Sequence, residues 1–182
     1  MPKTKPAMAV SEYAILGVLQ EAPAHGYRIA QRFAPGQDVG LLCPLEHSNV
    51  YALLHELQEQ GSIRGQQIVV GVRPPRTVFA LTPAGEAVVQ AWLAEPVTPL
   101  HRLRLDFLLK LYFIVKRSPE DAAVLIDRQL AVGTQHLNEM HTELATLAPE
   151  SLEHLVVDSK RLAVQSFITW LSCKRGQLPF LA

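Results

Sequence analysis

The sequence predicts a mostly α-helical protein with one small β-hairpin, organised in two parts. Apolar residues recur at helical spacing through most of the chain. One stretch after Gly61 is instead rich in β-branched and aromatic residues, which favours strands. Pro96 and Pro99 mark a boundary between the parts. The chain has 182 residues, 48% of them hydrophobic and 19% charged, which is ordinary globular composition and enough for one or two small domains.

Two short helices are expected near the N-terminus. The first covers residues 11–20, begins with Ser11 as its N-cap and is ended by Pro23. The second covers residues 27–33 and follows the tripeptide His25-Gly26-Tyr27. We expect Gly26 to allow a close approach, His25 to cap the helix and Tyr27 to lie on its inner side.

The third predicted helix begins at His47 or Ser48, with Ser48 favoured as its N-cap, and is stopped by Gly61. An apolar stripe recurs at i, i+3, i+4 and i+7 and consists of Val50, Leu53, Leu54 and Leu57. The first turn is unusually polar, because it carries His47, Ser48, Asn49 and Tyr51. Free backbone N–H groups and the positive end of the helix dipole lie there as well, so this turn suits phosphates and base edges. An ordinary surface helix with a polar cap remains the alternative.

Two strands, residues 62–70 and 77–81, are predicted next. The connection between them is stiffened by prolines and carries Arg73 and Arg76. A further helix then starts with Thr82 as N-cap and Pro83 at its first position. Three helices, a hairpin and a helix form a winged helix-turn-helix, in which the third helix enters the major groove. In that fold the loop of the hairpin lies along the DNA backbone or minor groove.

Three motifs carry a family resemblance. They are His25-Gly26-Tyr27, the segment from Asn49-Val50-Tyr51 to Gly61-Ser62-Ile63, and the segment from Arg76-Thr77 to Ala84-Gly85. In this order and spacing they resemble the PadR-like transcriptional regulators. The resemblance implies a DNA-binding repressor, usually dimeric and often released by a small ligand such as a phenolic acid or drug. Residues 48–51 depart from the family's usual Gly-Thr-Leu-Tyr-like turn, which implies a different operator, and the wing is poorer in charge, which puts affinity in doubt.

Six residues are the candidate DNA contacts. By its position in the family motif, Tyr51 is expected to reach a phosphate, with a half-buried tyrosine closing the core as the alternative. Asn49 is the candidate for reading adenine, against a merely solvated amide. Arg73 and Arg76 are expected to bind phosphate or enter the minor groove, against solvated loop charge. His47 and Ser48 complete the set, all of which lie in the third helix and the hairpin.

The C-terminal half is predicted to be a helical dimerisation domain. Residues 105–115 resemble the opening helix of the family's larger, Vir-type C-terminal domain. Ser118-Pro119 then starts a long helix whose apolar residues follow a heptad seam: Ile126, Leu130, Gly133, Leu137, Met140, Leu144 and Leu147. We expect this seam to meet a second copy, the alternative being an antiparallel hairpin within one chain. The expected division is a disordered arm at 1–10, a winged domain at 11–95, a helical domain at 96–176 and a tail at 177–182.

The charge balance is the main difficulty for a nucleic-acid partner. Lys plus Arg and Asp plus Glu both number 17, so binding must depend on local placement of charge. A winged-helix protein–protein interaction module that never touches DNA is therefore the alternative function. No membrane span, signal peptide, metal site, cofactor or catalytic constellation is expected, and two distant cysteines favour the reducing cytoplasm. A small aromatic effector is expected to bind between the winged domain and the C-terminal helices.

Overall fold

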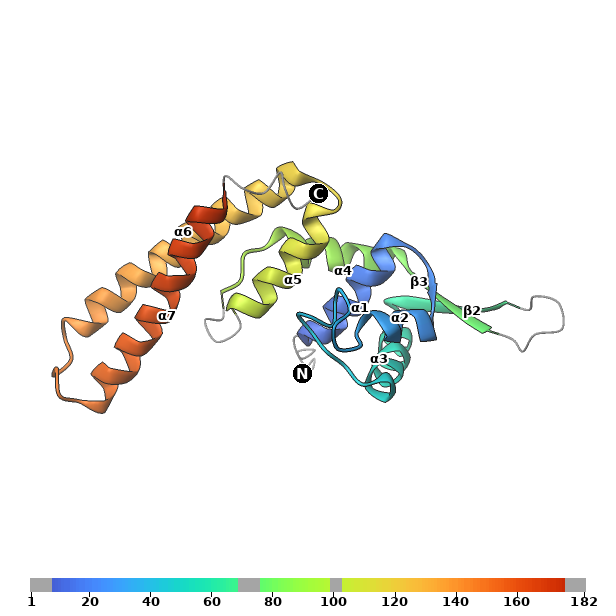
Figure 1. Ribbon diagram of the computed structural model, residues 1–182, viewed down its shortest axis with the longest axis horizontal. Helices are drawn as coiled ribbons and strands as arrows, with labels where there is room; N and C mark the ends of the chain where they lie inside the picture. The colour runs from blue at the N-terminus through green and yellow to red at the C-terminus, as the bar shows by residue number, and fades with distance from the viewer. Residues whose placement is uncertain (1–7, 69–75, 99–102, 176–182) are drawn as a thin grey trace, which may run out of the picture. The chain divides into compact units, whose positions relative to one another are not determined.

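A computed structural model describes residues 8–68, 76–98 and 103–175 of the chain (Figure 1). The fold is mostly α-helical with a small antiparallel sheet, as the sequence predicts. The chain forms two compact units, Met1–Leu93 and Ala94–Ala182. Their elements, in order, are α1 (Val10–Glu21), β1 (Ala24–His25), α2 (Gly26–Arg32), α3 (His47–Glu59), β2 (Ile63–Ile68), β3 (Arg76–Leu81), α4 (Pro83–Ala94), α5 (Leu103–Val115), α6 (Pro119–Leu144) and α7 (Leu152–Lys174).

The first unit is built around α1, whose central residues are buried on every side. Ala14, Ile15 and Leu16 have no exposed surface, which explains why the sequence of this helix is almost uniformly apolar. The sheet has the order β1-β3-β2, and both pairings are antiparallel. Figure 1 shows β2 and β3 extending away from the helices as a wing. The sequence did not predict β1, because two residues are too few for any periodic signal.

Three details of the first two helices differ from expectation. The N-cap of α1 is Ala9, not Ser11. His25 is the N-cap of α2 but its side chain makes no capping hydrogen bond. Tyr27 faces outward, with 62% of its surface exposed, because α2 buries Gly26, Ile29 and Ala30 instead. The buried face of α2 therefore contains fewer residues than the sequence indicated.

The ends of α3 and the start of α4 are fixed by their caps. Gly61 has a φ of +73°. Its N–H donates to Gln58, and the N–H of Ser62 donates to Leu57, which is the Schellman pattern that glycine favours. At α4 the hydroxyl of Thr82 accepts the N–H of Gly85, which confirms Thr82 as its N-cap. Helix α3 begins at His47, one of the two predicted starts, but its N-cap is Glu46 and not Ser48, which lies within the first turn.

The second unit contains α5 and a long hairpin of α6 and α7. Ser118 caps α6 by accepting the N–H of Asp121, as predicted. The heptad seam of α6 lies against α7 of the same chain, so the expectation that it meets a second copy is wrong. Gly133 shows how closely the helices approach, because a Cβ there would lie 2.1 Å from Cδ1 of Ile168. An antiparallel hairpin within one chain thus accounts for the seam.

Three side chains bind the backbone of the segment that enters the second unit. Gln129, fully buried, accepts the N–H of Val97 at 2.7 Å and donates to its carbonyl at 3.0 Å. Lys110 donates to the carbonyl of Glu95, and Arg128 donates to that of Ala94. Burial lowers the pKa of Lys110 to about 8, against the opposing effect of nearby carboxylates. Among the described helices, none is both long and apolar enough to cross a membrane.

Candidate nucleic-acid interface

The first turn of α3 presents its polar side chains to solvent. His47, Ser48, Asn49 and Tyr51 are all exposed, whereas Val50, Leu54 and Leu57 anchor the opposite side of the helix in the core. Within the described part of the chain, the side chains of Ser48, Asn49 and Tyr51 make no hydrogen bond. Their donors and acceptors are therefore available to a ligand. The structure thus brings four of the six predicted residues together on one turn.

Tyr51 is held in place by the glycine of the His25-Gly26-Tyr27 tripeptide. A Cβ at Gly26 would lie 2.7 Å from Cε1 of Tyr51 and 3.3 Å from its hydroxyl oxygen, so the ring lies directly on the backbone at the start of α2. This explains the need for glycine there, as the sequence predicted. The ring keeps 47% of its surface exposed. Tyr51 therefore does not close the core, and its half-exposed ring lies on the backbone of α2.

A second aromatic contact fixes the position of His47. Its ring meets that of exposed Tyr27 edge to face, with centroids 5.8 Å apart. Both residues lie at helix starts, His47 on α3 and Tyr27 on α2. Since Tyr27 was expected to face inward, sequence reasoning did not include it among the candidate site residues.

The outer face of the wing carries arginines. Cα partners across the β2–β3 ladder are Arg64 with Ala80, Gln66 with Val78, and Ile68 with Arg76. Side chains alternate between faces along a strand, so Arg64, Gln66 and Arg76 share one face. Buried Phe79 lies on the other face. Arg76 is thus a wing residue as predicted, Arg64 joins it, and Arg73 lies outside the described residues.

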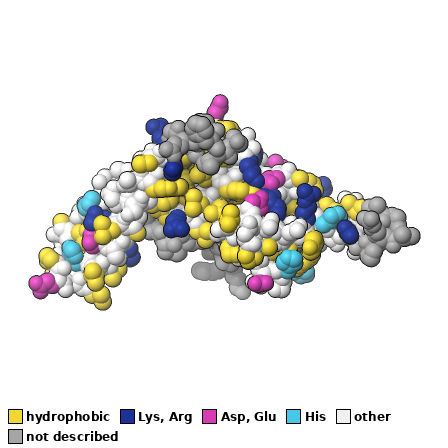
Figure 2. Space-filling model, viewed as in Figure 1, with side chains coloured by type: hydrophobic (Ala, Val, Ile, Leu, Met, Phe, Trp, Pro, Cys, Tyr) yellow, Lys and Arg dark blue, Asp and Glu magenta, His cyan; other side chains and the backbone are white. Residues whose placement is uncertain are grey.

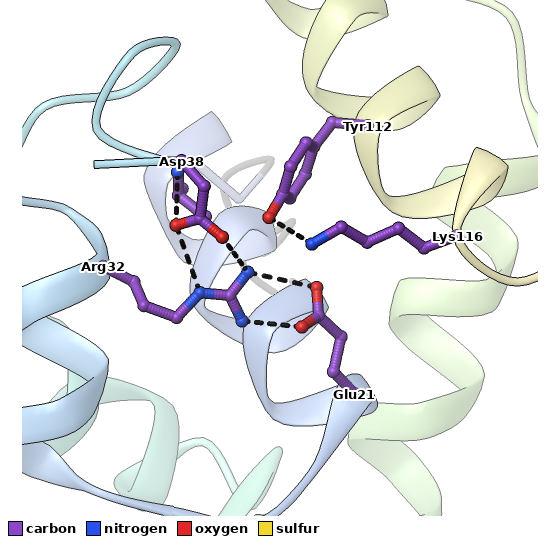
Figure 3. A network of polar contacts seen from close by, with 6 residues as sticks. Glu21, Arg32, Asp38, Tyr112 and Lys116 are labelled. Carbon is purple, nitrogen blue, oxygen red and sulfur yellow. Dashed lines mark hydrogen bonds and ion pairs between the residues drawn. The ribbon is translucent and has the colours of Figure 1, made fainter. Parts of the chain in front are cut away.

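Local pairing decides which arginines can meet an anion. Arg32 lies between two carboxylates, at 2.7 Å from Oε2 of Glu21 and 2.7 Å from Oδ2 of Asp38 (Figure 3). Its charge is therefore already compensated. Arg28, Arg64 and Arg76 are exposed and form no ion pair with any other described residue. Sequence reasoning overlooked Arg28 and Arg64; Arg64 is placed on the same face as Arg76 only by the register of the β2–β3 ladder.

Carboxylates limit this surface to part of α3. Glu46 precedes the helix, and Glu56 and Glu59 follow in its later turns. His55 lies 3.6 Å from Glu59, and both side chains are well exposed. Glu56 and Glu59 disfavour phosphates along the C-terminal half of α3, and Glu46 adds one negative charge beside the first turn, where the free backbone N–H groups favour an anion. In the described ranges no group of three or more His, Cys, Asp or Glu residues is arranged to hold a metal ion.

Comparison with known families identifies this arrangement. Residues 15–91 match the model of the transcriptional regulator PadR-like family. The chain carries a PadR-like domain. The matched residues run from the middle of α1 through most of α4 and so contain all the interface residues described above.

Individual relatives extend the similarity beyond the PadR-like domain. The negative transcriptional regulator PadR of Bacillus subtilis is 27% identical over 174 residues, which cover 90% of this chain and 94% of the relative. A probable transcriptional regulator of Mycobacterium tuberculosis is 30% identical over 87 residues, covering 48% of this chain and 45% of that protein. The crystal structure of B. subtilis PadR with operator DNA has 24% identity and a TM-score of 0.45, covering 93% and 99% of the two chains.

Proposed function

We propose that this PadR-like protein is a transcriptional repressor that binds an inverted-repeat operator as a homodimer. The observation that carries the proposal is the first turn of α3, where Ser48, Asn49 and Tyr51 are exposed and their hydrogen-bonding groups are unused within the described chain. Such a turn has the donors and acceptors that base edges and phosphates require. The curated PadR relative, a negative regulator, supports repression.

Each contact has a physical role in this proposal. Asn49 reads a base, since its side-chain NH2 can donate to N7 of adenine while its Oδ1 accepts from the N6 amino group, a bidentate contact. Tyr51 donates its hydroxyl to a phosphate and so sets the register of α3 in the groove. His47 and Ser48 add polar contacts at the helix start, where the backbone N–H groups also favour an anion. Arg64 and Arg76, with Arg73 between the strands, bind the phosphates beside the wing.

A small aromatic effector is also part of the proposal. B. subtilis PadR has been crystallised in complex with p-coumaric acid, and that regulator aligns with nine tenths of this chain. An effector releases DNA only if it binds the DNA-free arrangement more tightly than the DNA-bound one. Trp92 and Trp170 provide intrinsic reporters for such binding. The protein would act in the cytoplasm as a regulator without enzymatic activity.

Selection of bound fragments from the protein's own genomic DNA tests this function. We expect enrichment of a few promoter-proximal fragments, with footprints that show two related half-sites about 10 base pairs apart or a multiple of that spacing. The alternative function is a winged-helix module that binds only protein, and its neutral charge balance is the observation in its favour. That alternative predicts passage through heparin without retention and no enriched fragment.

A further inference from the structure

Side chains from α5 and α6 bind the carbonyl groups at the C-terminal end of α4. Pro96 follows two residues after Ala94, the last residue of α4, so the helix cannot continue past it. The last carbonyl groups of a helix need donors and attract positive charge, yet the last turn of α4 contains no basic residue. Arg128 of α6 donates to the carbonyl of Ala94 at 3.0 Å. Lys110 of α5 donates to the carbonyl of Glu95 at 2.6 Å, so the helical unit supplies the charge that the end of α4 lacks.

Gln129 of α6 holds the residue after Pro96 by both of its backbone groups. Its Oε1 accepts the N–H of Val97 at 2.7 Å, and its Nε2 donates to the Val97 carbonyl at 3.0 Å. Both residues are buried, so water has little access to these groups and losing either bond is costly. We call Lys110, Arg128 and Gln129 the linker clamp, because together they bind three of the four residues from position 94 to 97.

The linker clamp begins where the two compact units divide. The division lies between Leu93 and Ala94, at the last residue of α4, and Ala94 is the first clamped residue. A connection of unpaired residues would leave its ends free to reorient. Here the backbone passes from a helix directly into hydrogen-bonded residues. A displacement of α6 is therefore passed to the end of α4 through a contiguous set of contacts.

We propose that the linker clamp fixes the joint between α4 and the helical unit, and that Gln129 is thereby a positioning residue that makes a dimer select one half-site spacing. This inference rests on the proposed function, which places two copies on one operator. Each base pair inserted between the half-sites adds about 3.4 Å and turns the second half-site by about 35°. A dimer with fixed joints then loses its second set of contacts, whereas a dimer with loose joints follows the change.

Direct contact of the linker clamp with DNA would be a different explanation for any effect on binding. Gln129 and Lys110 are buried, so neither reaches a phosphate. On the face drawn in Figure 2, Lys and Arg side chains over the helical unit are scattered among hydrophobic and uncharged ones. Gln129→Met removes both hydrogen bonds to Val97 without changing the charge. An effect of this variant on spacing therefore reports the joint and not a lost phosphate contact.

Operators of altered spacing test the proposal with the full-length chain. Wild type should bind the selected operator about 100-fold more tightly than the same operator with two base pairs inserted between its half-sites. Gln129→Met should reduce this ratio below about tenfold by weakening binding to the selected operator, while a single half-site is bound as by wild type. Gln135→Met, which removes an exposed amide from the same helix, is the matched control and should keep the wild-type ratio. A wild-type ratio for folded Gln129→Met would overturn the proposal.

Two further variants keep the test independent of stability. Arg128→Ala changes an exposed residue, so it should fold where Gln129→Met does not, and it should also lower the spacing ratio. Gln129→Glu can restore the clamp, because a protonated carboxyl group accepts one hydrogen bond and donates another as the amide does. Burial raises the pKa of such a group, so this variant should show the wild-type ratio at about pH 6 and the Gln129→Met ratio at about pH 8.5. An equal ratio at both values would contradict a role for the paired hydrogen bonds.

Nitrogen-15 relaxation of the DNA-free chain separates this inference from the proposed function. In wild type, the amides of the winged unit and of the helical unit should share one rotational correlation time. In Gln129→Met the winged unit should tumble faster than the helical unit. Different correlation times in wild type would overturn the fixed joint, even with a confirmed operator. One shared correlation time without binding to any DNA fragment would contradict only the proposed function.

Discussion

Two surfaces of this protein, the starts of α2 and α3 in the winged unit and α7 in the helical unit, expose different kinds of large side chain. In the winged unit the exposed aromatic residues are Tyr27 and Tyr51, and both carry hydroxyl groups. In the helical unit the exposed large residues of α7 are Leu152, Leu155, Val156, Leu162 and Trp170, nearly all without a polar group. A hydrated polyanion is bound by hydrogen bonds and charge, whereas another protein is bound by burying apolar area. We therefore expect DNA to bind the winged unit, as proposed above, and apolar surface to cover the exposed face of α7.

The same comparison explains how a neutral chain can bind DNA. In the winged unit, Arg32 is compensated by Glu21 and Asp38, while Arg28, Arg64 and Arg76 are exposed without an ion pair to another described residue. The net charge of the chain counts Arg32 and the exposed arginines alike, so it does not show this difference. What matters for affinity is how many uncompensated cations meet phosphates, not the sum over the chain.

The largest expected effect tests whether the apolar seam of α6 is buried within the chain. Ile126→Ala removes a side chain with no exposed surface and should lower the free energy of unfolding by about 2–5 kcal/mol. Val124→Ala, two residues away on the same helix and 48% exposed, is the control and should cost well under about 1 kcal/mol. Chemical denaturation of both variants at fixed protein concentration gives the values. Equal losses would mean that α6 does not bury its seam within the chain.

The next effect concerns base readout by α3. Asn49→Ala should change sequence preference at one base pair of each half-site, with a penalty of about 1–3 kcal/mol that disappears when that base pair is altered. Gln90→Ala, which removes an exposed amide from α4, should leave the preference unchanged. Competition binding against a panel of single-base operator variants measures both. A uniform loss over all variants would reduce Asn49 to a non-specific contact.

The next effect depends on pH and tests whether the charge of Lys110 is buried in the helical unit. Burial lowers the pKa of Lys110 from 10.5 to about 8 in the folded chain. The unfolded chain therefore binds more protons between pH 8 and 10.5, so this group makes the free energy of unfolding rise with pH over that interval. The difference in the free energy of unfolding between wild type and Lys110→Met should rise by about 1 kcal/mol over that interval, allowing for solvent screening. A flat or falling difference would show that Lys110 is not buried.

The smallest effect separates the wing arginines from the rest. Arg64→Ala and Arg76→Ala should each reduce the slope of log affinity against log salt by about one and weaken all DNA sequences alike. Arg117→Ala, an exposed arginine of the helical unit, should leave the slope unchanged. Titrations at several salt concentrations provide the slopes. If Arg117→Ala and Arg64→Ala change the salt slope equally, the wing arginines do not bind DNA phosphates.

Much of the fold follows from local sequence signals. Thr82 and Ser118 are capping residues before prolines, and Gly61 has the positive φ that its position after α3 predicted. These features depend only on residues a few positions apart, so the sequence determines them. β1 was missed for the opposite reason, since Ala24 and His25 form a strand only through their pairing with β3.

What each helix packs against was harder to predict than the helices and strands themselves. The seam of α6 has heptad spacing that fits either a second chain or a neighbouring helix, and only the contact of Gly133 with Ile168 decides between them. In the candidate interface, His47, Ser48, Asn49 and Tyr51 were predictable because consecutive helical positions share a turn. Arg28 and the exposed orientation of Tyr27 depend on how α2 packs, which no spacing along the chain reveals.

Mapping the groove contact of α3 directly tests the central assignment of DNA to the winged unit. With both native cysteines replaced by serine, Ser48→Cys carries an iron–EDTA cleavage reagent at the first turn of α3, and the selected operator is the substrate. We predict two clusters of cleavage in the major groove, related by two-fold symmetry and about 10 base pairs apart or a multiple of that spacing. The same reagent attached to Gln90→Cys on α4 should cleave the operator weakly and at other positions. Tight operator binding with no cleavage near the half-sites from position 48 would contradict the account.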